Sequence, residues 1–433
     1  MNNSKNFIKE FIKKDFLVQV FYCLFLFTLT SYFIFLINRG YSKDCYNISE
    51  FLINYEGGFV RRGLIGQLLL FFHKNFNISV YYTIICICVL SYLVLVYFFV
   101  RSFIKNGYTL FILPFCFFLG FPIMFQTWAR KDVLLVLLFI LAIKLSYKKE
   151  IKHLILLNIV LSIGLLVHEL IGFLSFPFLI LLLNHNQKTT PRYGLVKNYL
   201  IVFLKLFPSI FTFLSVLYFH GTKEISLAIF KSWENVYFPA IKEECRGNAI
   251  DALSWSVTQE LSVVFKNVFM QFDYGIYAPL AWTITFLILY YILTNTHTLN
   301  FKLFSYKPFS NFDKTHISNL LILQFMAVFP LFITGVDYGR WIFFWITTSF
   351  VLILLIPKEI LAKLFPLIIQ KISERINYYL SFCLKSSFVL LFILTLGISG
   401  DTWKLGYTIL SSSIFYISYF FYNFQSFLAF LYT

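Results

Sequence analysis

Charged residues are scarce in this chain. Only 13% of its 433 residues are Asp, Glu, Lys or Arg, whereas 59% are hydrophobic and 21% are aromatic. A soluble protein of this length needs far more polar surface to coat its core. The composition therefore excludes a soluble globular protein and indicates a polytopic integral membrane protein.

Metal-binding patterns are also missing. The seven cysteines form no CxxC pair, and the seven histidines form neither an HExxH motif nor a cluster. Because such patterns are the usual sequence signs of a bound transition metal, we expect no metal and no cofactor. Cys45 and Cys245 fall in two loops predicted to lie outside the membrane, where a disulfide is permitted. The sequence leaves open whether they are bridged or unpaired.

No internal repeat, linker or soluble domain interrupts the apolar runs. We therefore expect one membrane domain over residues 1–433. The basic residues are spread singly between the runs rather than gathered in a stripe, which gives no sign of nucleic-acid binding. Anionic membrane lipids are sufficient partners for them.

Long apolar runs predict an all-α bundle of about twelve transmembrane helices. We interpret Leu154–Leu183 as two short spans, because one long span would place the basic loops Asn295–His316 and Lys358–Lys385 on the outer side. The run Gly63–His73 is too short to cross and predicts an interfacial or re-entrant helix. The expected spans are Phe16–Ile37, Val80–Val100, Tyr108–Phe125, Val133–Leu145, Leu154–Val167, Leu170–Leu183, Tyr199–Phe219, Ile276–Leu293, Ile317–Thr334, Ile342–Pro357, Ser386–Ser399 and Thr408–Leu431.

Charge is divided unequally between the two sides of this arrangement. The side of Met1 holds 22 Lys+Arg against 6 Asp+Glu, and the other side holds 14 against 14, so the whole net charge of +16 lies on one face. The positive-inside rule places that face, and both termini, in the cytoplasm. The neutral outer face has two large loops, residues 38–79 and the long loop 220–275. In the long loop, Ile225–Phe238 and Asp251–Val268 have the apolar spacing of amphipathic surface helices.

The first outer loop contains the motif EGGFVRRGLIG. Two adjacent arginines, Arg61 and Arg62, stand among glycines that allow close approach of a ligand. Arginine grips phosphate oxygens at two points, which indicates a phosphate or pyrophosphate site. The alternatives are contact with lipid headgroups or pairing with Glu56.

A second motif, VHELIGFLSFP, places His168 and Glu169 between two apolar segments. Burial raises the pKa of a carboxyl group and can make it a general base, while an adjacent histidine can orient an acceptor. The alternative is a solvated, inert turn.

A third motif, GVDYGRW, spaces Asp337 and Arg340 three residues apart. This spacing fits a local ion pair at a helix end. In the functional alternative, Arg340 binds phosphate together with Arg61 and Arg62, and Asp337 orients the Arg340 side chain. The motif WARKD offers Arg130 for the same role or, alternatively, a solvated turn.

In its layout, with outer-face arginines and one long outer loop, the chain resembles the O-antigen and capsule polymerases of the Wzy type. It is also similar to the wider class of polyprenyl-phosphate-dependent membrane glycosyltransferases. The resemblance implies a bacterial inner-membrane enzyme that transfers a glycan from undecaprenyl pyrophosphate to another lipid-linked repeat unit on the outer face. It also implies essential outer-loop arginines, and suggests a flippase and a chain-length regulator as partner proteins.

The residues fit this chemistry. A sugar that leaves on pyrophosphate needs fixed positive charge, which the arginines would provide. The acceptor hydroxyl needs a base, for which Glu169 is the first candidate and Glu56 the second. We expect aromatic residues of the long loop to stack on sugar rings. These are Trp233, Tyr237 and Trp255.

Three alternatives stay open. They are a monosaccharide transferase with a polyprenyl-phosphate donor, a flippase for lipid-linked oligosaccharides, and a membrane transporter without enzymatic activity. A flippase should have charge at mid-membrane and two related halves, whereas here the charges gather at one face, which favours an enzyme.

Overall fold

The computed structural model describes residues 45–106, 129–148, 150–186, 194–234, 249–266, 314–335 and 337–383, with parts of 272–294. This part of the chain is helical apart from one short pair of strands. Tyr237, Cys245 and four of the expected spans lie outside the described residues. These spans are Phe16–Ile37, Tyr108–Phe125, Ser386–Ser399 and Thr408–Leu431.

Seven helices occupy positions at which the sequence predicts spans, with ends shifted by a few residues. They are α5 (Val80–Asn106), α7 (Asp132–Ser146), α8 (Ile151–Val167), α9 (Leu170–His185), α10 (Gly194–Tyr218), α14 (Lys314–Thr334) and α15 (Tyr338–Leu355). Within the described residues, α5, α10 and α14 are long and apolar enough to cross a membrane. The structure therefore supports a membrane protein, while a total of about twelve crossings stays a prediction.

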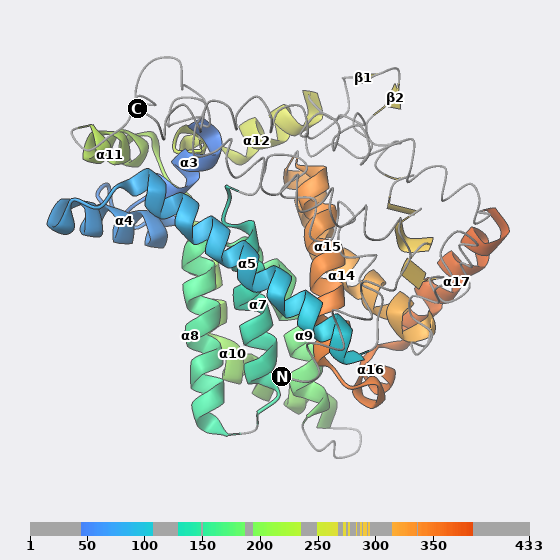
Figure 1. The fold of residues 1–433 in the computed structure, drawn as a ribbon. Helices are drawn as coiled ribbons and strands as arrows, with labels where there is room; N and C mark the ends of the chain where they lie inside the picture. Colours follow the sequence, from blue (N-terminus) through green and yellow to red (C-terminus); the bar gives the residue numbers. More distant parts are fainter. Residues whose placement is uncertain are drawn as a thin grey trace, which may run out of the picture.

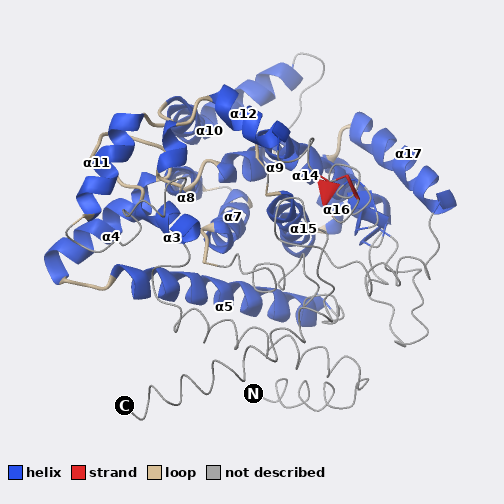
Figure 2. Ribbon diagram, turned by 90° about the horizontal axis from the view of Figure 1, so that it is seen from above, coloured by secondary structure: helices blue, strands red, loops and turns tan. Residues whose placement is uncertain are grey.

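Helix α7 lies at the centre of the bundle and packs against α5, α8, α9 and α15. Its sequence, DVLLVLLFILAIKLS, is apolar on most of its faces, and most of its side chains are buried, although Leu141 and Lys144 are exposed. Seen from above, α7, α8 and α15 stand nearly end-on, while α5 lies across them (Figure 2). The expected division of Leu154–Leu183 is present, because the chain leaves the helical conformation at His168 between α8 and α9.

Short helices gather at one end of this bundle (Figure 1). They are α3 (Cys45–Leu52), α4 (Gly63–Phe76), α11 (Lys223–Trp233), the 3-10 helix η6 (Asp251–Ser254) and α12 (Val257–Val264).

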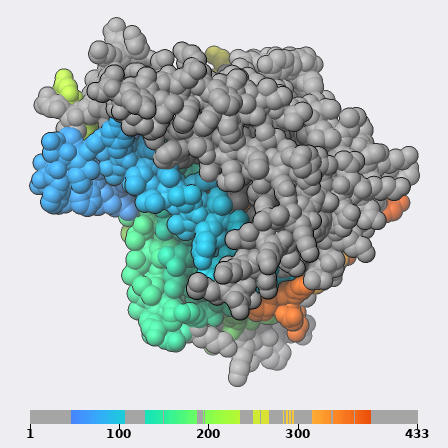
Figure 3. All heavy atoms as spheres, in the orientation of Figure 1, coloured from blue at the N-terminus to red at the C-terminus, as the bar shows by residue number. Residues whose placement is uncertain are grey.

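Helix α4 is the helix expected from Gly63–His73, and both ribbon views show it lying across the direction of α8 (Figures 1 and 2). It exposes apolar side chains at Leu68, Phe71, Phe72 and Phe76. Figure 3 shows α4 and α8 at the surface of the molecule. This orientation fits a helix at the membrane interface.

Three details differ from the sequence predictions. Ile276, expected to begin a span, pairs instead with Asp273 in an antiparallel pair of strands, β1 (Phe272–Asp273) and β2 (Ile276–Tyr277). The amphipathic piece expected over Asp251–Val268 is divided into η6 and α12, because Ser256 forms a capping box with Gln259 that starts a new helix.

The third difference lies in the expected inner loop after α15. That loop contains two helices, α16 (Lys358–Leu364) and α17 (Leu367–Cys383), and α17 packs on α14.

Candidate functional site

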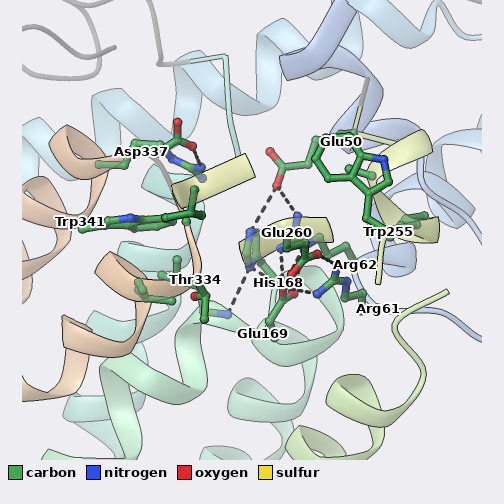
Figure 4. Close-up of a pocket in the computed structure, with 18 of the residues that line it drawn as sticks. Glu50, Arg61, Arg62, His168, Glu169, Trp255, Glu260, Thr334, Asp337 and Trp341 are labelled. Carbon is green, nitrogen blue, oxygen red and sulfur yellow. Dashed lines mark hydrogen bonds and ion pairs between the residues drawn. The ribbon is translucent and has the colours of Figure 1, made fainter. Parts of the chain in front are cut away.

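A cavity of about 320 Å³ lies where the short helices meet the ends of α8, α9, α14 and α15. Side chains of all three predicted motifs line it, although they are more than 100 residues apart in sequence (Figure 4). The ionisable lining residues are Tyr46, Glu50, Arg61, Arg62, His168, Glu169, Glu260, Asp337 and Arg340. The helix ends therefore bring the separate motifs to one site.

Arg62 and Glu169 form the central ion pair. The Arg62 Nε lies 3.0 Å from Oε2 and 3.1 Å from Oε1 of Glu169, and Nη2 also donates to Oε1. The Nη1 of Arg61 lies 3.6 Å from Glu169 Oε1. Although burial raises the pKa of Glu169, the charge of Arg62, with Arg61 beside it, holds that pKa well below its usual range. The predicted rise in this pKa is therefore wrong, because no local sequence pattern indicates that an arginine from a distant loop pairs with Glu169.

Local backbone geometry produces this pairing. His168 is extended, with φ −166° and ψ 129°, so α8 ends there, and Glu169 is the N-cap of α9. Arg62 adopts the left-handed conformation, with φ 67°. The Nζ of Lys131 donates to the carbonyl oxygens of Arg62, at 3.0 Å, and Val167, at 3.4 Å. Lys131 therefore joins the two motif loops.

Glu50 is a site residue that the sequence interpretation missed. It lies on α3 and is buried, and its Oε1 lies 3.3 Å from Nε2 of His168. The Nδ1 of His168 accepts from the backbone N–H of Leu170 at 3.2 Å and lies 3.3 Å from Glu169 Oε2; a neutral ring with its proton on Nε2 satisfies the contacts with Glu50 and Leu170. Burial and the charge of Arg62 lower the pKa of His168, in agreement with the neutral form.

The charged state of Glu50 follows from its partners. Burial raises its pKa, but the His168 hydrogen bond and the charge of Arg62 hold that pKa well below its usual range. The sequence feature that could have identified Glu50 is the one that identified Glu169. Each is a single acidic residue among apolar neighbours, which for Glu50 include Phe51 and Leu52.

A second group of charges joins α7 and α15. Arg340 is buried and contacts Asp132 at two points, with Nε at 2.8 Å and Nη2 at 2.6 Å, and it also donates to Asp337. The local ion pair predicted between Asp337 and Arg340 is therefore present. The Nη1 of Arg130 lies 2.9 Å from the same Asp337 carboxylate, and its Nε donates to Asn47. Because carboxylates occupy both arginines, neither is placed to bind phosphate as predicted.

Some predicted residues do not face the cavity. Glu56 is half-exposed, is not among the lining residues, and lies 3.7 Å from Nζ of Lys74 instead of pairing with the motif arginines. Trp233 is buried, and its indole N–H donates to the Leu52 carbonyl at 2.8 Å, so it packs the short helices together and cannot stack on a sugar. Trp255 does line the cavity. The described residues contain no cluster of metal-ligating side chains.

Positive and negative charges balance at this site. We define the charge cluster as the cations Arg61, Arg62, Arg130, Lys131 and Arg340 with the carboxylates Glu50, Asp132, Glu169, Glu260 and Asp337. Two buried donors of the lining, Arg61 Nε and Trp341 Nε1, have no hydrogen-bond partner among the described residues. They lie on opposite sides of the cavity (Figure 4). The site therefore offers both signs of charge and two free donors to a ligand with oxygen acceptors.

Comparison with family models, curated proteins and solved structures finds no match for this chain. Its function must therefore be argued from the site.

Proposed function

We propose that this protein is a membrane glycosyltransferase that polymerises lipid-linked repeat units of O-antigen or capsule. It would transfer the growing glycan from undecaprenyl pyrophosphate to a second lipid-linked unit on the outer face of the bacterial inner membrane. The observation that carries the proposal is a cavity at the helix ends in which arginines and ionised carboxylates face the same space.

Such a site suits a reaction that separates charge. As the bond between the anomeric carbon and the phosphate oxygen breaks, the sugar becomes cationic and the leaving phosphate gains negative charge. Arg61 would stabilise the leaving group, and the carboxylates of Glu50 and Glu169 would stabilise the sugar cation. A site of one sign could stabilise only one of these partners.

The acceptor step follows from the same geometry. The acceptor hydroxyl oxygen bonds to the anomeric carbon, and its proton passes to the carboxylate of Glu169. Although Glu169 is a weak base because of Arg62, the hydroxyl becomes acidic as its oxygen bonds to the sugar cation. His168, held by Glu50, positions the loop that carries Glu169.

The lipid carrier of the substrate fits the surroundings of the cavity. Helix α4 begins directly after Arg62 and exposes Phe71, Phe72 and Phe76. Its orientation across the bundle would place these rings in the headgroup layer, beside a substrate whose polyprenyl chain stays in the membrane.

A second candidate function is monosaccharide transfer from a polyprenyl-phosphate donor. The cavity volume of about 320 Å³ favours it, since this lies at the small end of ligand sites. A flippase or transporter receives less support, because the charge cluster lies at the ends of α8, α9 and α14 rather than at their middle.

The test is complementation in a strain that lacks the protein. Compared at equal amounts of inserted protein, Glu169→Gln and Glu50→Gln should build no long glycan chains, because each removes a carboxylate from the cavity. Glu56→Gln is the matched control, since Glu56 lies outside the cavity and should be dispensable. Wild-type chain length with both Glu169→Gln and Glu50→Gln would remove the carboxylates from the chemistry and reject the proposed reaction.

A further inference from the structure

We propose that Arg61 provides a subsite for a single phosphate group and that Glu260 occupies it until the phosphate arrives. This inference rests on the proposed function, because the phosphate would be the one attached to the transferred sugar. The inference distinguishes Arg61 from Arg62 and Arg340, for which the sequence predicts the same role. It also assigns a role to Glu260, a residue of the long outer loop.

The three cavity arginines differ in how firmly they are held. Both Nε and Nη2 of Arg62 donate to Glu169. Arg340 donates from Nε and Nη2 to Asp132 and from Nη1 to Asp337. Breaking either arrangement would leave a buried carboxylate without its partner, which is strongly unfavourable. These two arginines are therefore part of the framework of the site.

Arg61 is held differently. Its Nη2 donates to Glu260 Oε1 at 3.1 Å, and its Nη1 reaches Glu169 only at 3.6 Å. Its Nε is buried and has no partner among the described residues. One edge of the guanidinium, Nε with Nη2, therefore holds a single carboxylate oxygen where it could hold two oxygens of a phosphate.

Glu260 can leave at low cost. Its side chain is 31% exposed, whereas those of Glu50 and Glu169 are 3% and 9% exposed. Arg61 is its one cationic partner among the described residues, and breaking a partly exposed ion pair of this kind costs less free energy than breaking a buried one. The Glu260 carboxylate can therefore return to water when an anion with better geometry competes for Arg61.

The backbone keeps the subsite in place during this exchange. The N–H of Arg61 donates to the carbonyl oxygen of Phe219 at 2.9 Å, which fixes the first outer loop to the start of the second. Glu260 lies on α12, an eight-residue helix that packs on α14. A rotation of the Glu260 side chain is sufficient, and no helix has to move.

Binding of inorganic phosphate and of pyrophosphate to the purified full-length protein in lipid nanodiscs tests this inference. Glu260→Gln should bind phosphate about fivefold more tightly than the wild type, because the competing carboxylate is gone. Glu224→Gln is the matched control, since it removes an exposed acid from the same outer loop without touching Arg61, and its affinity should equal that of the wild type. Arg61→Met should abolish binding, and melting curves without ligand check that each variant is folded.

Three results would overturn the inference, and they differ in what else they affect. If Arg61→Met loses phosphate but Glu260→Gln binds it like the wild type, Glu260 does not occupy the subsite, and the proposed function stands. If neither the wild type nor Glu260→Gln binds phosphate or pyrophosphate, the subsite does not exist and the proposed function loses its leaving-group site. An equal gain in affinity with Glu224→Gln would show a general effect of charge and would also contradict the inference.

Discussion

At the scale of single residues, Lys131 is the most deeply buried cation of the charge cluster. Its side chain is 1% exposed, and its ammonium lies 5.7 Å from the centre of the Phe51 ring. By donating to the carbonyl oxygens of Arg62 and Val167, it fixes the backbone on both sides of the central ion pair. Lys131 is thus a positioning residue that has no need to touch the substrate.

Because Lys131 is buried, the free energy of unfolding of the protein should depend on pH. Burial lowers the pKa of Lys131 from 10.5 to about 8, although the Glu50 carboxylate opposes the shift. Between these two pH values, Lys131 is protonated in the unfolded chain and deprotonated in the folded protein. The contribution of Lys131 to the free energy of unfolding therefore rises with pH in this range and is constant below about pH 8. Between about pH 7 and about pH 9.5, the wild type should therefore gain melting temperature relative to Lys131→Met.

Thermal melting of purified protein at a series of pH values provides the measurement. Lys144→Met removes an exposed lysine from α7, the helix that begins directly after Lys131, and is the matched control. A difference between the wild type and Lys131→Met that stays constant over the whole pH range would show that Lys131 does not titrate in this window.

The sequence predicted several of the site residues but not their partners. Arg62 and Glu169 were recognisable because charge next to apolar runs is rare and expensive. Their pairing depends on contact between residues 107 positions apart, which no local pattern records. For the same reason, the sequence did not predict the roles of Glu50 and Lys131, and it wrongly predicted that Trp233 is free to stack on a sugar. The burial of these residues depends on the packing of helices that are distant in sequence.

At the scale of elements, the packing of α4 against the chain before it places Arg62. A Cβ atom at Gly66 would lie 2.0 Å from the backbone carbonyl oxygen of Ile53. Only glycine permits this approach, which brings the start of α4, and with it Arg62, to the cavity.

Gly66→Ala should therefore destabilise the protein. In an exposed helix this change would stabilise by about 1 kcal/mol, but the clash with backbone should cost more, roughly 1–3 kcal/mol in total. Leu68→Ala, on the exposed face of the same helix, is the control and should have little effect. Melting temperatures in detergent give the comparison, and a Gly66→Ala variant as stable as the wild type would contradict this packing.

The elements themselves were predicted well where one physical signal dominates. Apolar length fixed the positions of α5, α8, α9 and α10 within a few residues. It failed at Ile276, where a polar loop forms a pair of strands before the apolar run continues. Helix α17 was missed because it is amphipathic and too polar to be recognised as a span.

At the scale of the whole molecule, topology decides whether the site is reachable from outside the cell. The cavity is lined by described residues of the two predicted outer loops together with the ends of α9, α10, α14 and α15. The partition of charge predicts that both loops lie on the outer face. The same face would then hold the substrate, the charge cluster and the interfacial helix α4.

Reporter fusions test this orientation. Fusions after Lys197, near Asn248 and after Lys307 should report inside, outside and inside, because the net positive charge of the chain lies on the side of Met1. A cytoplasmic signal near Asn248 would place the cavity on the wrong side for a lipid-linked repeat unit.

Transfer of a lipid-linked glycan at this site should be visible by mass spectrometry of lipid extracts. Cells without the protein, or with Glu169→Gln in its place, should accumulate single repeat units on polyprenyl pyrophosphate and lack longer lipid-linked chains. Accumulation of a polyprenyl-phosphate monosaccharide would indicate the second candidate function. If lipid-linked glycans are the same in amount and length with and without the protein, the account is contradicted.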